Sequence, residues 1–86
     1  MAKGDWFSVS DVQKAWKGYP ETSAALQAAM RAGWRLREQG HGGRLYCAYE
    51  HDPMHRPHQF SVAHTPKSDG REARRIRAEL RKCLGE

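Results

Sequence analysis

The sequence lacks the features of a membrane or secreted protein. No stretch approaches the roughly 18 consecutive apolar residues of a membrane span, and the chain does not open on a basic segment followed by an apolar one. We therefore expect no membrane contact and a cytoplasmic location. Cysteine is scarce, because Cys47 and Cys83 are the only two. Two are too few for the disulfide scaffold of a small secreted domain, so reduced thiols are expected. A single disulfide between the two is the alternative.

Length and apolar content are sufficient for one core and little more. At 86 residues, of which 38% are hydrophobic, the chain is long enough for one domain and too short for two. A domain of this size buries only about 60% of the surface that its unfolded chain exposes, so most apolar side chains are needed for folding. The sequence has no internal repeat and no low-complexity segment. A deep pocket is not expected.

Residues 1–20 are interpreted as an N-terminal extension with one short helix. Ser10 is the predicted N-cap of this helix, which spans residues 11–17. We expect the helix to lie at the periphery. The large aromatic side chains of the extension are expected to cover the core rather than to stack on nucleic-acid bases, because a small domain needs them buried. These side chains are Trp6, Phe7 and Trp16.

Residues 21–86 are predicted to form a small, single α+β domain. A helix over residues 20–33 has a narrow face of small apolar residues, which suits close packing against a sheet. A second helix, capped by Ser68 or Asp69, closes the domain. The expected order is helix, three-stranded antiparallel sheet, helix. The strands are predicted over residues 34–38, 45–50 and 59–63. Their core-facing residues are expected to be Trp34, Leu36, Leu45, Cys47, Tyr49, Phe60 and Val62.

The last helix contains most of the positive charge. The chain has 15 Lys and Arg against 10 Asp and Glu, a net charge of +5, and the segment from Arg71 to Leu84 contributes +4 of it. Its arginines lie opposite the apolar stripe of the helix. A solvated helix face would interleave the two signs in i, i+4 pairs, whereas segregated charge favours contact with a polyanion such as RNA. The residues of this helix expected to contact RNA are Arg71, Arg74, Arg75 and Lys82.

A glycine-rich turn over residues 39–43 is expected to join the first two strands. His41 lies within it, between Gly40 and the pair Gly42-Gly43. Glycines let a backbone approach a phosphate without side chains in the way. Histidine transfers protons near neutral pH because its unperturbed pKa is about 6.5. The alternative is a flexible hairpin with a histidine of no special role.

Several short motifs follow one another in a fixed order between Ala25 and Cys83. They are a short helix, Ala32-Gly33-Trp34 entering the first strand, Gly40-His41 before Leu45-Tyr46, a third strand, and Thr65-Pro66 before the closing helix. In these motifs, and over about two thirds of its length, the chain resembles the HicA family of toxins, which act as ribonucleases on messenger RNA.

This resemblance implies a double-stranded-RNA-binding-like fold, a catalytic His41 and neutralisation by an antitoxin protein. His41 would act as general base and take the proton of an RNA 2′-hydroxyl that attacks the adjacent phosphate, with no metal or cofactor. DNA lacks that hydroxyl and would be bound without being cut. The phosphate charge is expected to be stabilised either by Arg44, next to the turn, or by Arg35 and Arg37, on the outward face of the first strand.

Two other functions stay open on the sequence alone. The same fold could bind RNA without cutting it. The basic chain could also be a small phage-type inhibitor that binds an acidic protein partner.

The remaining histidines and the cysteines do not form a recognised metal motif. No Cys-x-x-Cys pair is present among Cys47, His51, His55, His58 and Cys83, and no His-x-x-x-His pair lies in a predicted helix. We therefore predict no metal and expect the cysteines to pack as small apolar residues. His64 ends the third strand and is either an exposed strand-end residue or a second acid-base group beside His41.

Overall fold

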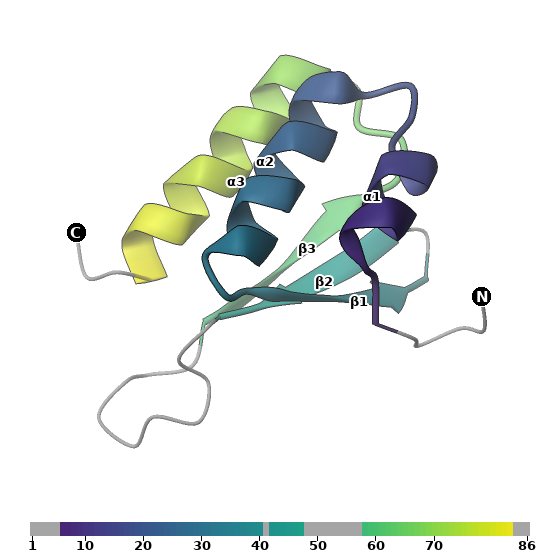
Figure 1. Cartoon of the computed structure of the whole chain (residues 1–86). Helices are drawn as coiled ribbons and strands as arrows, with labels where there is room; N and C mark the ends of the chain where they lie inside the picture. The colour runs from purple at the N-terminus through teal and green to yellow at the C-terminus, as the bar shows by residue number, and fades with distance from the viewer. Residues whose placement is uncertain (1–5, 41, 48–57, 84–86) are drawn as a thin grey trace.

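The described part of the chain contains the predicted elements in the predicted order. In this computed structural model, residues 6–40, 42–47 and 58–83 are described. They form α1 (Val9–Ala15), α2 (Pro20–Arg31), β1 (Arg35–Gln39), β2 (Gly42–Tyr46), β3 (Gln59–Ala63) and α3 (Asp69–Cys83) (Figure 1). The predicted α+β fold is confirmed. None of these helices is long and apolar enough to cross a membrane.

The three strands form one antiparallel sheet, and the helices lie together on one face of it (Figure 1). β2 is the central strand, in which Leu45 is opposite Leu36 of β1 and Phe60 of β3. α2 and α3 lie side by side, and α1 packs against α2. No described helix lies on the other face of the sheet.

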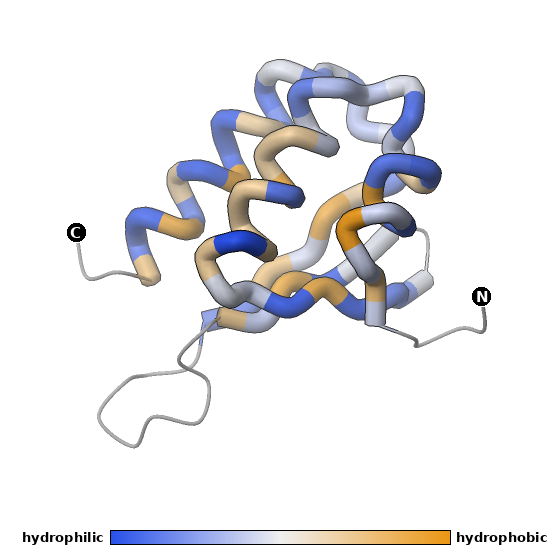
Figure 2. Tube along the Cα trace, viewed as in Figure 1, coloured by the Kyte–Doolittle hydropathy of each residue, from blue (hydrophilic) through white to orange (hydrophobic). Residues whose placement is uncertain are grey.

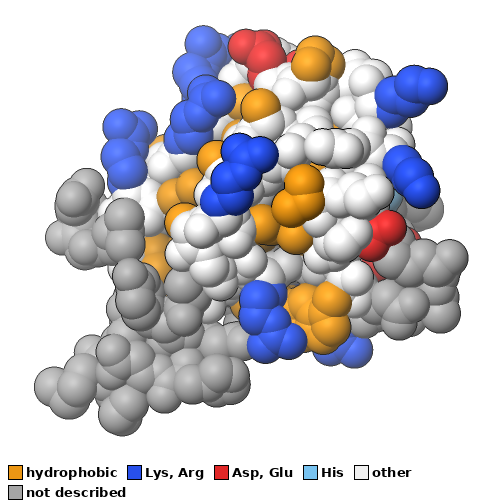
Figure 3. Space-filling model, viewed as in Figure 1, with side chains coloured by type: hydrophobic (Ala, Val, Ile, Leu, Met, Phe, Trp, Pro, Cys, Tyr) orange, Lys and Arg blue, Asp and Glu red, His pale blue; other side chains and the backbone are white. Residues whose placement is uncertain are grey.

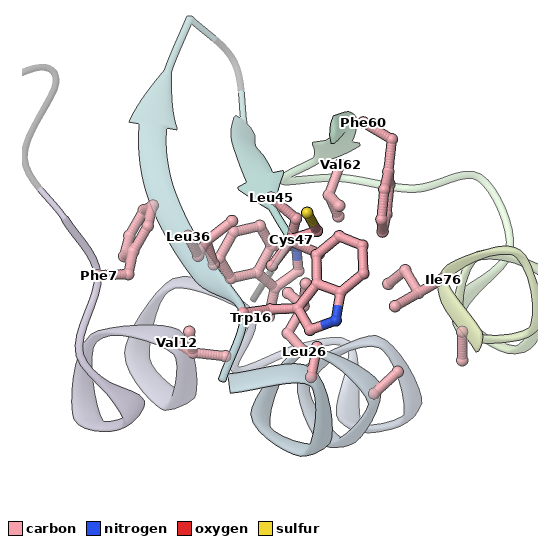
Figure 4. Packing of buried hydrophobic residues seen from close by; sticks show 14 of the residues in the cluster. Phe7, Val12, Trp16, Leu26, Leu36, Leu45, Cys47, Phe60, Val62 and Ile76 are labelled. Carbon is pink, nitrogen blue, oxygen red and sulfur yellow. The ribbon is translucent and has the colours of Figure 1, made fainter. Parts of the chain in front are cut away.

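The hydrophobic core fills the space between the helices and the sheet. Leu26 of α2, Leu36 and Leu45 of the sheet and Ile76 of α3 are at most 1% exposed, and Figure 4 shows them among the side chains that converge there. Burial of a side chain of this kind contributes about 1.5–3 kcal/mol. Hydrophobic and hydrophilic residues alternate along α3, as in an amphipathic helix (Figure 2). The described strand residues that were expected to face the core are all buried, and Tyr49 lies outside the described residues.

α1 begins two residues earlier than the sequence predicts. Ser8 is its N-cap, and the prediction that Ser10 has this role is wrong. The Ser8 hydroxyl accepts a hydrogen bond from the Asp11 N–H at 3.1 Å, and the Asp11 carboxylate accepts one from the Ser8 N–H at 2.9 Å. This reciprocal capping box satisfies amide groups that the start of a helix leaves without partners. The backbone hydrogen bond from Ser8 is the main cause of a lowered pKa at Asp11.

The N-terminal segment is part of the core rather than peripheral to it. Phe7 is 5% exposed, and Val12 and Trp16 are fully buried. The Phe7 N–H donates to the carbonyl of Leu36 at 2.7 Å, which fixes the segment to the outer edge of β1. The Trp16 indole N–H donates to the carbonyl of Ala63 in β3 at 2.9 Å. These contacts join residues 6–20 to both edges of the sheet.

The first turn of α2 is capped by a residue from the start of α3. Tyr19 occupies the N-cap position and makes no side-chain cap hydrogen bond. Instead, the Asp69 carboxylate accepts from the backbone N–H of Glu21 at 2.9 Å and of Thr22 at 2.7 Å. Burial raises the pKa of Asp69, but these hydrogen bonds outweigh it and hold that pKa below 3.8. Of the two caps predicted for α3, Ser68 or Asp69, it is Ser68 that precedes the helix, and its hydroxyl accepts from the Arg71 N–H at 3.3 Å.

Candidate nucleic-acid interface

The face of the sheet opposite the helices is lined by basic, polar and aromatic side chains. Strand residues alternate between the two faces, so the residues between the buried ones point away from the core. Arg35, Arg37 and Gln59 are exposed there, and Arg44 and Tyr46 are half-buried. Among the described residues no helix covers this face. Three of the arginines predicted to contact a phosphate therefore lie on one surface.

Arg37 and Arg44 are direct neighbours across the strands. The register of β1 and β2 places Arg37 opposite Arg44, and Arg35 opposite Tyr46. Side chains at directly opposite positions have Cβ atoms about 4.5–5.5 Å apart, and like charges so placed destabilise a sheet. An anion bound between them would interact favourably with both guanidinium groups.

The Arg44 guanidinium is held by neutral partners. Its Nε donates to the Gln59 Oε1 at 2.6 Å, and one terminal nitrogen donates to the Ser61 hydroxyl at 3.0 Å. Within the described part of the chain, no acidic side chain pairs with Arg44. These hydrogen bonds fix the side chain without neutralising it, so its charge is oriented and available to a ligand.

A shallow depression connects this face with α3. It has a volume of about 600 Å³ and is lined by Gln39, Gly42, Gly43, Arg44, Ser61, Val62, Ala63, Glu72 and Arg75. Arg75 donates to the carbonyl of Ser61 at 2.6 Å and pairs with Glu72 at 2.6 Å. Arg44 and Arg75 are thus the two cations at the place where the sheet face and the helix meet.

The charges of α3 divide into paired and unpaired residues. Arg75 pairs with Glu72, and Lys82 pairs with Glu79 at 3.3 Å, each at i, i+3 spacing. Arg71 and Arg74 are exposed, and no ion pair involves them within the described ranges. Lys and Arg side chains are prominent over α3 on the face that Figure 3 shows. Of the α3 residues predicted to contact RNA, Arg71 and Arg74 therefore have charges more available to a ligand than those of Arg75 and Lys82.

The predicted site residues fall into two groups on different surfaces. Arg35, Arg37 and Arg44 are on the outer face of the sheet, whereas α3 packs on the opposite face. The two groups approach each other at the depression beside β3. A ligand that contacts both groups must cross the β3 edge, which an extended polyanion can do and a small molecule cannot.

The glycine-rich turn is shorter than predicted. β2 begins at Gly42, and Gln39 pairs with Gly42, so the prediction that residues 39–43 form the turn is wrong. A Cβ at Gly42 would collide with the carbonyl of Val62, and one at Gly43 would lie 2.8 Å from Leu36 Cδ1. Close packing of the sheet therefore accounts for both glycines. Gly40 has a φ of 56°, which suits a tight hairpin, and His41 lies outside the described residues.

The described histidines and cysteines have structural partners. His64 is half-buried and stacks on Trp16, with ring centroids 4.7 Å apart and 7° between the planes. His58 Nε2 lies 2.7 Å from the Glu79 carboxylate. Burial raises the pKa of the Cys83 thiol to about 11, with a further contribution from its neighbour Cys47. No group of three metal-ligating side chains is close enough to hold an ion within residues 6–40, 42–47 and 58–83.

Trp6 is the residue of this surface that the sequence reading missed. Phe7 and Trp16 are buried as expected, but Trp6 is 42% exposed, so the prediction that it covers the core is wrong. Neighbouring residues of an extended segment point to opposite sides. Because Phe7 points into the core, Trp6 must point outward, and the adjacent pair of aromatics was the signal for this.

Comparison with known proteins adds no relative. Searches against protein-family models, curated proteins and solved structures gave no match. The function is therefore argued from the positions and charges of the residues at this site.

Proposed function

We propose that this domain binds RNA through the outer face of its sheet, with the N-terminal half of α3 extending the contact. The observation that carries the proposal is the directly opposed pair Arg37 and Arg44, with Arg35 beside it. Positive side chains gathered on a face that no described helix covers favour an anionic ligand. A ribose-phosphate backbone supplies anions at a regular spacing, which suits a row of arginines.

Salt dependence tests this proposal. Each phosphate contact to a single strand contributes about 0.7 to the slope of the logarithm of affinity against the logarithm of salt concentration. The double variant Arg37→Gln, Arg44→Gln should weaken binding. It should also make the slope shallower by about 0.7 for each phosphate that the variant no longer neutralises. A matched control, Arg77→Gln with Arg81→Gln, removes the same charge from exposed positions of α3 and should have the smaller effect. If both variants reduce the affinity for RNA and the salt dependence equally, net charge alone drives binding.

We further propose that the bound RNA is cleaved, with His41 as general base. This proposal rests on the resemblance to HicA toxins together with the basic face. His41 is bonded to Gly42, the first residue of β2, and Gly42 lines the same depression as Arg44. The 2′-hydroxyl, once deprotonated by His41, would attack the adjacent phosphorus and displace the 5′-oxygen, which would take up a proton from water. The products would be a 2′,3′-cyclic phosphate and a 5′-hydroxyl, and Arg44 would stabilise charge on the phosphate.

Comparison of wild type with His41→Gln separates cleavage from binding. Wild type should leave RNA fragments with cyclic phosphate ends and arrest growth when expressed, whereas His41→Gln should bind RNA equally and leave it intact. A DNA oligonucleotide should be bound and not cut, because it has no 2′-hydroxyl. Intact RNA with both proteins would support a binding module without catalysis.

The partners and location follow from this proposal. An RNA-cleaving toxin acts in the cytoplasm and requires an antitoxin protein to restrain it. If the purified chain forms a tight complex with a protein, does not bind RNA and does not affect growth, the proposal fails in favour of a protein inhibitor.

A further inference from the structure

The N-terminal segment holds an aromatic ring beside the basic sheet face. Trp6 forms an isolated antiparallel β-bridge with Arg37. The N–H of the next residue, Phe7, donates a hydrogen bond to the carbonyl of Leu36 at 2.7 Å. Phe7 is buried while Trp6 is 42% exposed. The backbone at β1 and the buried Phe7 therefore fix an outward-facing indole at the sheet edge.

Cations and a second aromatic ring surround this indole. The guanidinium carbon of Arg35 lies 4.0 Å from the centroid of the Trp6 ring, and that of Arg37 lies 5.6 Å away. The Tyr46 ring contacts Trp6 edge-on, with centroids 5.6 Å apart and 70° between the planes. Two cation–π contacts and one aromatic contact orient the ring, so little conformational freedom is left for a ligand to remove.

The indole also borders an apolar hollow. A depression of about 440 Å³ is lined by Trp6, Phe7, Val9, Met30, Trp34, Arg35 and Leu36. This volume falls in the range of about 300–1,000 Å³ that small ligands occupy. An apolar floor with an arginine and an indole at its margin suits a flat aromatic group that carries a negative charge beside it.

We propose that Trp6 stacks on an unpaired RNA base, while Arg35 and Arg37 contact the phosphates next to it. This inference rests on the proposed RNA binding and narrows its substrate class to single-stranded RNA. In an A-form duplex the faces of the bases are hidden in the stack, and only an unpaired base presents a face to a side chain. Aromatic platforms in basic grooves are the usual means by which proteins hold single strands.

The charges of this surface favour RNA over a protein as the occupant. An exposed tryptophan beside arginines can also anchor a protein partner. Here, however, Arg44 has only neutral hydrogen-bond partners among the described residues, and it lies directly opposite Arg37. A polyanion compensates the Arg44 charge while its bases reach the indole, so one ligand satisfies both features.

Intrinsic fluorescence tests the stack directly. Trp16 and Trp34 are 0% and 5% exposed, so Trp6 is the tryptophan that a ligand can reach. The probe is an oligouridylate of about ten 2′-O-methyl nucleotides, which resists cleavage through the 2′-oxygen. Two controls are an abasic strand with the same number of phosphates and a duplex of the same length.

The expected results distinguish stacking from charge. The single strand should quench Trp6 fluorescence, and the abasic strand and the duplex should not. Trp6→Leu should weaken single-strand binding about 5- to 150-fold, whereas Trp6→Phe should retain most of the affinity. Thermal unfolding of each variant shows whether the fold is kept.

Each other outcome has a definite meaning. If the wild type binds the single strand without quenching, or if Trp6→Leu binds it as well as wild type, the stacking inference is wrong and the proposed RNA binding stands. Equal quenching by the abasic strand would also overturn it. If the wild type binds none of the three probes, the proposed function fails and the inference fails with it.

Discussion

Replacement of Trp16 tests whether the N-terminal segment belongs to the core. The Trp16 side chain is fully buried, packs edge-on against Phe7 at 5.6 Å and stacks on His64 at 4.7 Å. Trp16→Ala would remove these contacts together with the hydrogen bond to the carbonyl of Ala63. Large-to-small changes at a buried tryptophan lower the free energy of unfolding by about 3–5 kcal/mol. That is much of the roughly 5–15 kcal/mol that stabilises a typical domain.

A smaller change separates the hydrogen bond from the packing. Trp16→Phe keeps an aromatic ring but leaves the Ala63 carbonyl without its indole donor, so the loss should be about 1–3 kcal/mol. For a domain of this size each kcal/mol lowers the melting temperature by about 4–8 °C. The free energies are measured by urea unfolding followed by far-ultraviolet circular dichroism. Trp6→Phe is the matched control at an exposed position and should stay within about 0.5 kcal/mol of wild type.

A small effect of Trp16→Ala would contradict this role for α1. If the variant lowers the free energy of unfolding by less than about 1 kcal/mol, a size common for replacements of little structural effect, then α1 does not contribute to the core. Residues 6–20 would then be an appended segment, as the sequence alone suggested.

Three further predictions concern individual side chains. Gly42→Ala should cost about 3 kcal/mol or more in urea unfolding, because its Cβ would meet the Val62 carbonyl, whereas Gly43→Ala should cost about 1–2 kcal/mol since the flexible end of Leu36 can move. Gly18→Ala, at a position with open space, is their control. Because the folded pKa of Asp69 is lowered, its contribution to stability is present at neutral pH and is lost as the pH falls below 3.8. Asp69→Asn should therefore make the urea midpoint less sensitive to acid, and an unchanged acid dependence would contradict the cap. The Cys83 thiol, with a pKa of about 11 and little exposure, should react with iodoacetamide only after urea is added, and rapid labelling of the folded protein would show that it is accessible.

Local patterns in the sequence were sufficient to predict the fold. Strand residues such as Leu36 and Val62 alternate with polar ones, and this alternation identified the face that is buried. The end of α2 was also readable, because Gly33 follows it with a φ of 103° and its N–H donates to the carbonyl of Met30. Signals of this kind depend on neighbours in the chain and need no knowledge of tertiary contacts.

The features that sequence reading missed depend on contacts between distant residues. Gly42 and Gly43 look like turn residues, but they are small because Val62 and Leu36 approach them across the sheet. The carboxylate of Asp69 caps a helix 47 residues away, which no local rule predicts. The candidate site was predicted in part. Alternation placed Arg35 and Arg37 on the outward face of the first strand, and Arg44 was singled out by its position next to the glycine-rich turn. That Arg37 and Arg44 lie directly opposite each other needed the strand register.

Both margins of the sheet are already occupied by the chain itself. The Phe7 N–H pairs with β1, and Arg75 donates to a carbonyl of β3. Exposed strand edges let sheets add to one another and aggregate, and a covered edge prevents this. On the proposed RNA strand, several copies of the domain would lie close together, and their covered edges would hinder pairing between their sheets. We therefore expect neighbouring copies not to join edge to edge, and we expect a partner protein to bind a surface other than a strand edge.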